Sequence, residues 1–300
     1  MNKAKLFKIL LHPKYILLKL DQKKIIKLPD KVFVNWCYEY RMGEKLNLNN
    51  PTNFNEKIQW LKLYDRNEQY TELADKYAVK EYLKNKIGEK YIIPLLGVWD
   101  TVDDINFNQL PQSFVLKTTH DSGGVVVIKD KSKMNIKKVK DTLNKSLNRD
   151  YYRIWREWQY KNVPRRIIAE KYMENDGDLK DYKIFCFNGI PKICLVCSNR
   201  SKELKKTWYD DNWNKLNLTE GGHKSETFIK KPKSFDQMKK ISTQIAEKTA
   251  FLRVDFYDIN GKPYVGEITF HPNGGYEQFN PEKWNKIFGN MIDLKNVQGE

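Results

Sequence analysis

The sequence predicts an α+β protein rich in antiparallel strands, and three observations support this. Before residue 90, apolar residues recur at helical spacing. From Tyr91 onward, short apolar runs bounded by turn residues indicate strands. Two pairs of these runs flank Asn188-Gly189 and Asn260-Gly261, which favour two-residue hairpin turns. Separate helical and antiparallel regions of this kind are typical of the α+β class.

The size and charge of the chain limit the functional classes to consider. Its 300 residues suffice for one large domain or two modest ones. A net charge of +16 suits an anionic substrate, a nucleotide, nucleic acid or a membrane surface. No dense basic run interleaved with aromatic residues occurs, so we expect no nucleic-acid partner.

The first 29 residues form a basic, amphipathic segment without a small-residue cleavage site. Such a segment either lies on an anionic membrane surface or packs as a helix on its own domain. No run approaches the roughly 18–20 apolar residues of a membrane span. We therefore expect a cytoplasmic protein, with peripheral contact at the inner face of the membrane as an open alternative.

The first half of the chain contains two predicted helices after a helical lead-in over residues 1–50. One helix begins at Asn53, where Asn53 and Glu56 have the spacing of a capping box. The second, "TELADKYAVKEYLKNKIG", covers residues 71–88 and ends at Gly88, a favourable C-terminal stop.

Further helices and strands alternate after residue 90. Strands are predicted in "YIIPLLGVW", "SFVLKTT", "VVVIKD" and "RRIIAEKYM", with a helix over about 135–160. Another helix covers "SFDQMKKISTQIAEKTA", with Ser234 and Gln237 as a capping box.

The four cysteines do not form a metal-binding pattern. Cys194 and Cys197 make a CxxC, but zinc needs a second ligand pair at matched spacing, and none follows. Because the pair lies in an apolar run, we interpret both thiols as small buried hydrophobes in a reduced compartment.

The stretch "FVLKTTHDSGGVVVI", residues 114–128, combines a strand-end lysine with adjacent glycines. Gly123 and Gly124 have no Cβ, so the backbone can approach a ligand closely. A glycine loop beside Lys117 is one way to hold phosphates. A surface hairpin with a snorkelling lysine fits this stretch equally well.

The last hairpin carries two acidic residues on facing strands. Arg253 and Asp255 are two residues apart and share a face, as do Glu267 and Thr269. Paired carboxylates suit Mg²⁺, and the arginine could neutralise a transferring phosphate. Ordinary cross-strand charge pairs are the alternative.

Read in order, these features resemble the ATP-grasp superfamily. The flanking phrases are similar to its teichuronopeptide-biosynthesis (TupA-like) branch, found in surface-polysaccharide gene clusters. They are "NFNEKIQWLKLYDR", "DKYAVKEYL", "IGEKYIIPLLGVWD", "LPQSFVLKTTHDSGG", "DYKIFCFNG", "WYDDNW" and "EITFHPNGG", and they extend over about residues 45–290. The resemblance implies two α+β subdomains that grip a nucleotide between antiparallel sheets. The expected division is a helical extension at 1–50, an N-terminal ATP-grasp part at 51–173 and a C-terminal part at 174–300.

The resemblance also implies nucleotide contacts. Lys76 and Lys117 look like the lysines that hold ATP phosphates, and the loop 118–124 looks like the lid over them. The lid residues implied to contact the phosphates are Ser122, Gly123 and Gly124. The implied adenine contacts are Glu170, Lys171, Tyr172 and Met173. The implied ribose contact is Asp181 or its near neighbour Asp178.

The implied catalytic and metal residues lie mainly in the last hairpin. Arg253 resembles the arginine beside the transferring phosphate, and Lys183 lies on the nucleotide side. Asp255 and Glu267 resemble the Mg²⁺ carboxylates. Where the family commonly has asparagine two residues after that glutamate, this chain has Thr269, with Asn273 close by. Either residue could complete the metal site.

The implied activity is an ATP- and Mg²⁺-dependent carboxylate–amine ligase acting through an acyl-phosphate. The implied acceptor is a uronic acid or similar small-molecule or glycan carboxylate of a capsule or cell-wall precursor, joined to an amine. A glycosyltransferase of the same pathway would use a metal-binding Asp-x-Asp, a pattern matched by Asp176 and Asp178. A phosphotransferase on the same fold and a non-catalytic binding protein are the remaining alternatives.

Overall fold

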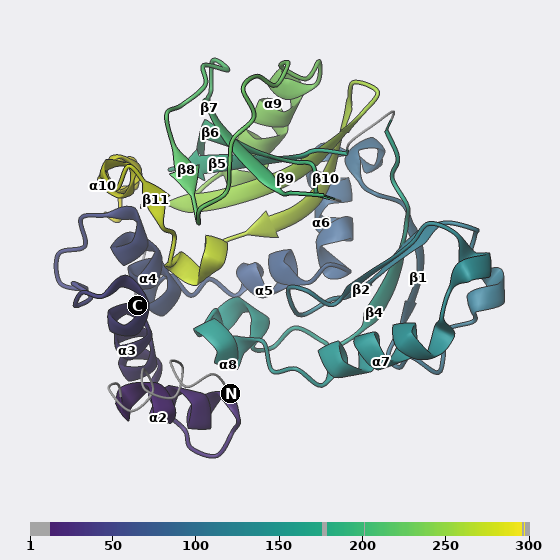
Figure 1. The fold of residues 1–300 in the computed structure, drawn as a ribbon, viewed down its shortest axis with the longest axis horizontal. Coiled ribbons are helices and arrows are strands. Elements are labelled where there is room, and N and C mark those ends of the chain that lie inside the picture. Colours follow the sequence, from purple (N-terminus) through teal and green to yellow (C-terminus); the bar gives the residue numbers. More distant parts are fainter. Residues whose placement is uncertain (1–12, 176–178, 201, 296, 298–300) are drawn as a thin grey trace.

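Two antiparallel sheets and a set of N-terminal helices make up the fold (Figure 1). The structure is a computed structural model and describes residues 13–175, 179–200, 202–295 and 297. Its helices are α2 Pro13–Gln22, α3 Asp30–Met42, α4 Phe54–Tyr64, α5 Gln69–Ala74, α6 Ala78–Ile87, α7 Ile136–Leu147, α8 Tyr152–Trp155, α9 Phe235–Ala246 and α10 Lys283–Asn290. Short 3₁₀ turns include Trp158–Tyr160 and Pro272–Gly275.

The first sheet has four strands in the order β1-β4-β2-β3. Their bounds are β1 Leu95–Trp99, β2 Phe114–Thr118, β3 Val125–Ile128 and β4 Ile167–Lys171. Helix α7 covers one face of this sheet through Val139 and Leu143. The glycine loop therefore connects two neighbouring antiparallel strands, β2 and β3.

The second sheet has five strands in the order β10-β9-β5-β6-β7. Their bounds are β5 Asp181–Phe187, β6 Ile190–Ser198, β7 Lys205–Asp210, β9 Phe251–Ile259 and β10 Lys262–Thr269, and β8 Thr219–Glu220 pairs separately with β11 Phe279–Asn280. The expected boundary after residue 173 falls between this sheet and the first. A parallel bridge from Ile92 to Val265 links β10 to the segment just before β1.

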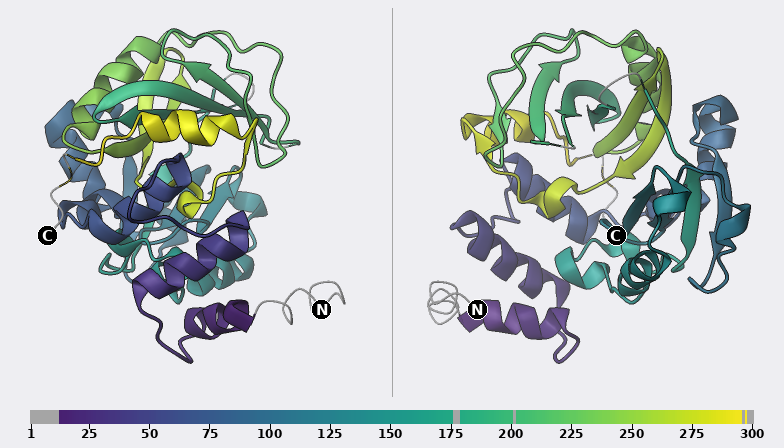
Figure 2. Two further views of the ribbon diagram at one scale, coloured as in Figure 1. Left: turned by 90° about the vertical axis from the view of Figure 1, so that its left-hand side faces the viewer. Right: turned by 45° about the vertical axis from the view of Figure 1, so that its right-hand side comes forward.

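Different helices pack against the two faces of the five-stranded sheet. Helix α9 packs on one face through Met238, Ile241 and Ile245, and α5 and α6 join it there. Helices α4 and α10 cover the other face through Phe54 and Phe288. Figure 2 shows α2 and α3 on the side of the molecule away from α9.

Several sequence predictions are confirmed. The Asn53–Glu56 capping box is present at the start of α4, and α6 ends at Gly88 with φ +95°. Both hairpins turn where expected: Asn188 and Asn260 have positive φ, as do the glycines that follow them. All four cysteines are buried and free. Separately from these predictions, the described ranges contain no group of three or more His, Cys, Asp and Glu side chains arranged to hold a metal ion.

Three helix predictions are wrong. The helix expected over 71–88 breaks between α5 and α6, where the buried Asp75 accepts a hydrogen bond from the backbone N–H of Tyr77. The helix expected over 135–160 is three separate pieces: α7 ends at Leu147, and α8 ends where the chain turns left-handed at Arg156. Ser234 makes no cap on α9, since its hydroxyl bonds Asp258 instead.

Candidate active site

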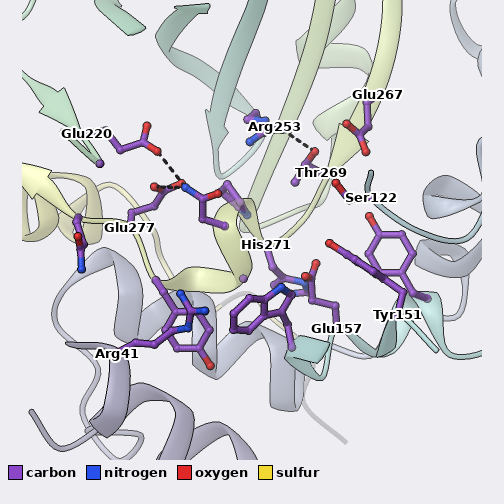
Figure 3. A pocket seen from close by; sticks show the side chains of 18 residues that line it. Arg41, Ser122, Tyr151, Glu157, Glu220, Arg253, Glu267, Thr269, His271 and Glu277 are labelled. Atoms are coloured by element: carbon purple, nitrogen blue, oxygen red, sulfur yellow. Dashed lines mark hydrogen bonds and ion pairs between the residues drawn. The ribbon is translucent and has the colours of Figure 1, made fainter. Parts of the chain in front are cut away.

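Two cavities adjoin at Glu267, which lines both. The larger cavity measures about 410 Å³ and lies among β9, β10, the segment from Tyr151 to Tyr160 and the turn after β10 (Figure 3). The smaller measures about 20 Å³ and lies between the two sheets. The hairpin predicted to carry chemistry therefore stands at the junction of the two cavities.

The smaller cavity gathers the predicted phosphate lysines. Lys76 and Lys117 both line it, together with Glu170 and Glu267. Lys76 lies at the break between α5 and α6 and donates to the backbone oxygen of Asp121 in the glycine loop. Residues separated by almost 200 positions in the sequence thus converge between the two sheets.

A third lysine in this cavity was not predicted. Lys80 and Lys117 each approach a different oxygen of Glu170 at 2.6 Å. Burial favours the neutral form of Glu170, but the charges of Lys117 and Lys80 outweigh it and hold the pKa of its carboxyl below the usual range. Glu170, predicted as an adenine contact, thus pairs with two lysines, and the three side chains together keep one positive charge. The only sequence feature that could have indicated a role for Lys80 is its position four residues after Lys76, one helical turn away.

The glycine loop is fixed by a buried aspartate. Asp121 accepts hydrogen bonds from the hydroxyls of Thr118 and Ser146. A Cβ at Gly124 would lie 1.9 Å from Thr118 Oγ1 and 2.2 Å from Ser146 Oγ, so this position requires glycine. Ser122 and Gly123 are exposed at the tip, and Ser122 reaches the larger cavity.

On the last hairpin, the predicted metal carboxylates are direct partners across β9 and β10. Both oxygens of Asp255 are engaged: Arg253 Nε donates to one at 2.7 Å, and Lys183 pairs with the other. The charges of Arg253 and Lys183 outweigh burial and lower the pKa of Asp255. Arg253 also donates to Thr269 Oγ1 at 3.0 Å.

Glu267 differs from Asp255 because its carboxylate makes no hydrogen bond or ion pair with the described residues, although its charge helps to raise the pKa of Arg253. Mg²⁺ at nucleotide sites commonly uses one or two protein carboxylates plus substrate phosphates. The free oxygens of Glu267, beside Asp255 and the lysine-lined cavity, fit that donor set.

Asn273 does not complete this pair. Its side-chain amide donates to Glu220 Oε1 at 3.0 Å and to Glu277 Oε2 at 2.7 Å (Figure 3). Lys206 also donates to Glu220 at 2.7 Å. Burial and the charge of Glu220 raise the pKa of Glu277 well above its usual range. For Glu220, burial is outweighed by the hydrogen bond with Glu277 and by Lys206, so its pKa is lowered.

The turn that presents Asn273 is held from behind by α4. Gln59 donates to the backbone oxygens of Gly274 and Gly275 at 2.9 and 2.8 Å, and the buried Lys62 also donates to Gly274. Burial lowers the pKa of Lys62 to about 8. Asn273, Gly274 and Gly275 all have positive φ, so these contacts stabilise a backbone conformation that most residues avoid.

The opposite wall of the larger cavity comes from the N-terminal helices and the broken segment after α7. Arg41 on α3 stacks over the rings of Trp155 and Tyr276, at 4.2 and 5.4 Å. Buried Glu157 and His271 also line the cavity, and burial lowers the pKa of His271. Trp155 lies at the cavity wall, whereas Trp158 packs against the core.

Apart from Glu170, the predicted base and ribose contacts do not line either cavity. The N–H of Lys171 donates to Pro94 at 3.0 Å, and half-buried Tyr172 and Met173 follow β4. Asp181, at the start of β5, pairs with Arg200. Asp176 and Asp178 lie outside the described residues, so neither the alternative ribose contact nor the Asp-x-Asp pattern can be placed.

The chain belongs to the TupA-like ATPgrasp family, whose model matches residues 56–293. Its fold is the ATP-grasp fold, as the sequence resemblance implied. No curated protein matches the chain.

Two solved structures illustrate the distance to characterised proteins. A D-alanine–D-alanine ligase from Bacillus anthracis complexed with ATP is 16% identical, with a TM-score of 0.41, over 82% of this chain and 69% of that one. A RimK domain protein ATP-grasp from Sphaerobacter thermophilus is 13% identical, with a TM-score of 0.39, over 76% and 70%. Family membership therefore rests on the family model.

None of the helices in the described part of the chain is long and apolar enough to cross a membrane.

Proposed function

We propose that this protein is an ATP-dependent carboxylate–amine ligase that forms an amide on a uronic acid of a surface-polysaccharide precursor. In the first step the γ-phosphoryl group of ATP is transferred to an acceptor carboxylate, giving ADP and an acyl-phosphate. In the second step an amine attacks the acyl carbon. The C–N bond forms, the C–O bond to phosphate breaks, and the nitrogen loses a proton to solvent.

The observation that carries this proposal is the junction of the two cavities at Glu267. Lys76 and Lys117 supply positive charge on the phosphate side, and Arg253 lies at the transfer point. Preorganised cations of this kind stabilise charge that develops on a transferring phosphoryl group. Mg²⁺ held by Glu267 and Asp255 would add Lewis-acid stabilisation of the same charge.

The larger cavity is the proposed acceptor pocket. Its Arg41–Trp155 stack combines a cation with an aromatic face, which suits an acidic sugar. Tyr151 and exposed Ser122 lie near Glu267 (Figure 3), so the glycine loop borders both substrates and could exclude water from the acyl-phosphate. The smaller cavity, at about 20 Å³, is far below nucleotide size, so under this proposal the residues around it rearrange when ATP binds.

Hydroxylamine trapping tests the proposed reaction. When the full chain is incubated with ATP, Mg²⁺, short glucuronate oligosaccharides and hydroxylamine, we expect ADP to be released and a hydroxamate to form. Lys117→Ala should abolish both, while Lys137→Ala, which changes an exposed lysine on α7, should leave them unchanged. ADP release without a hydroxamate would favour a phosphotransferase. Stabilisation by UDP-glucuronate but not by ATP would favour a glycosyltransferase.

We also propose peripheral contact between the N-terminal region and anionic membranes. Ile25 is 64% exposed, and the side chains of Lys23, Lys27 and Lys31 are exposed around it. Basic residues beside exposed apolar ones favour binding to anionic lipid surfaces. Cosedimentation with phosphatidylglycerol vesicles should fall several-fold in Ile25→Ser/Lys27→Gln. Equal binding by this variant and the wild type would contradict the proposal.

A further inference from the structure

A third cavity lies apart from the two that meet at Glu267. It measures about 410 Å³, and none of its lining residues lines either of the other cavities. Tyr182 and Ile229 line it and belong to the core on the α9 face of the five-stranded sheet. Lys183, the next residue on β5, points to the opposite face and pairs with Asp255. The third cavity is therefore on the face of β5 opposite to the residues proposed for phosphoryl transfer.

Phe228 is presented at this cavity by a segment whose backbone is fixed. The residue is 74% exposed. On one side of it the backbone N–H of Glu226 donates to Thr207 Oγ1 at 2.9 Å, and on the other the N–H of Ile229 donates to the Tyr209 hydroxyl at 3.0 Å. An exposed aromatic ring on a preorganised backbone is typical of a binding surface, because little conformational freedom is lost when a ligand packs on it.

Two lysines beside this ring have no acidic partner. Lys180 and Lys230 line the cavity and form no ion pair or hydrogen bond with the described residues. Glu226 is the acidic residue among those that line the cavity, and it is already paired with Lys205 at 3.0 Å. The charge that the cavity presents is therefore positive, which favours an anionic ligand.

The polar groups of the wall favour an acidic carbohydrate over a phosphate compound. The Glu226 carboxylate accepts from the Ser198 hydroxyl at 3.4 Å, and it would repel phosphate oxygens, which bring no hydrogen to donate. Sugar hydroxyl groups donate as well as accept, so they suit Glu226, and the apolar face of a sugar ring packs well on Phe228. Carboxylates on the same sugars would pair with Lys180 and Lys230.

We propose that the third cavity is a second binding site for an acidic glycan, with Phe228 as the stacking surface and Lys180 and Lys230 as the carboxylate partners. The inference rests on the proposed function for the identity of this glycan, a uronate-containing acceptor. A chain held here by one segment has a raised effective concentration at the acceptor pocket. Chains too short to reach both cavities gain nothing from the second site.

Methyl NMR on the full chain, without ATP, tests the site in the absence of turnover. The probe is tetraglucuronate, and the observed group is the carbon-13-labelled δ1 methyl of Ile229, assigned with Ile229→Val. This signal should shift on titration. The affinity read from the shift should fall about fivefold in Lys180→Gln/Lys230→Gln, as expected for two partly exposed ion pairs. Lys137→Gln, which changes an exposed lysine on α7, should match the wild type.

A second variant tests the stacking surface at a position where folding is not at risk. Phe228→Ser changes an exposed side chain, so it should keep the wild-type circular dichroism spectrum and weaken tetraglucuronate binding about fivefold or more. The matched control is Ile190→Ser, which removes a 52% exposed apolar side chain from β6. Unchanged affinity in both cavity variants would overturn the site. An equal Ile229 shift with tetraglutamate or triphosphate would overturn the assignment to a glycan.

The dependence on chain length separates this inference from the proposed function. In the hydroxylamine assay, octaglucuronate should have a lower KM than diglucuronate, and Phe228→Ser should reduce the ratio of the two KM values about threefold. The same ratio in both proteins would refute the anchoring role. Hydroxamate formation in the wild type without any shift of the Ile229 signal would refute the third cavity alone. Absence of hydroxamate in the wild type would refute the ligase proposal, whereas a shifted Ile229 signal would still support the glycan site.

Discussion

Replacement of Glu170 by glutamine should destabilise the protein strongly. The change preserves the size of the side chain and removes the negative charge between Lys80 and Lys117. The Glu170 side chain is 5% exposed, and those of the two lysines are 15% and 14% exposed, so water cannot replace the lost partner effectively. Like charges about 4 Å apart repel by about 4 kcal/mol at an effective dielectric of about 20, so two ammonium groups without their shared carboxylate would destabilise each other.

Breaking a buried pair by removing one partner typically costs about 3–5 kcal/mol, and we expect Glu170→Gln to fall in that range. Urea unfolding at pH 7 measures the loss, and Glu174→Gln, an exposed control, should change stability by less than about 0.5 kcal/mol. The folded-state pKa of Glu170 is depressed, so its stabilisation is present above the unfolded pKa and is lost as pH falls through the folded pKa. The stability difference between wild type and variant should therefore shrink in acid.

ATP gives an additional readout, because its phosphates would replace the missing negative charge. Mg-ATP should raise the melting temperature of Glu170→Gln more than that of the wild type. A destabilisation below about 1 kcal/mol would refute the reasoning that the carboxylate pairs with both lysines.

Three further changes test other parts of the site. Gly124→Ala places a Cβ 1.9 Å from Thr118 Oγ1, so it should lower the free energy of unfolding in urea by about 1–3 kcal/mol. It should also lower the affinity for ATP measured by calorimetry, and an unchanged affinity would contradict a role for the loop in binding ATP. The pKa of Lys62 is lowered to about 8, so the folded state favours the neutral amine and the free energy of unfolding of the wild type should rise from pH 8 to about 10.5. Urea unfolding should show that this rise exceeds that of Lys62→Met by roughly 3 kcal/mol. A stability difference between the two proteins that does not change with pH would contradict the buried charge. Asp255→Asn leaves the buried guanidinium of Arg253 and ammonium of Lys183 without their shared anion, so it should lower the melting temperature and abolish ADP release. Turnover within twofold of the wild type would exclude Asp255 from the reaction.

Local patterns predicted the parts of this molecule that short-range chemistry determines. Asn-Gly at a hairpin turn needs only two residues with positive φ. The capping box at Asn53 is equally local. These features were found because each lies within a few residues of its cause. The facing positions of Asp255 and Glu267 need more than the strand period, because they depend on a register shift between Val265 and Glu267; an unbroken ladder would place Gly266 opposite Asp255.

Long-range pairings were beyond the same reasoning. Lys80 belongs to the site only through its ion pair with Glu170, which lies 90 residues further along the chain. Strand β4 carries Glu170 and pairs with β2, which carries Lys117. Ser234 bonds Asp258 rather than capping its helix, and that partner comes from β9. Arg41 gave no motif at all, since its role depends on how α3 packs against Trp155.

The position of Arg41 has a consequence for how the protein can be modified. The family match begins at residue 56, so this arginine lies upstream of the matched region while still lining the larger cavity. A fragment trimmed to the matched residues would retain Lys76 and Lys117 but lose that part of the cavity wall. Under the proposed function, substitutions in the first 50 residues would therefore change which acceptor the cavity takes and leave the residues proposed to hold ATP in place.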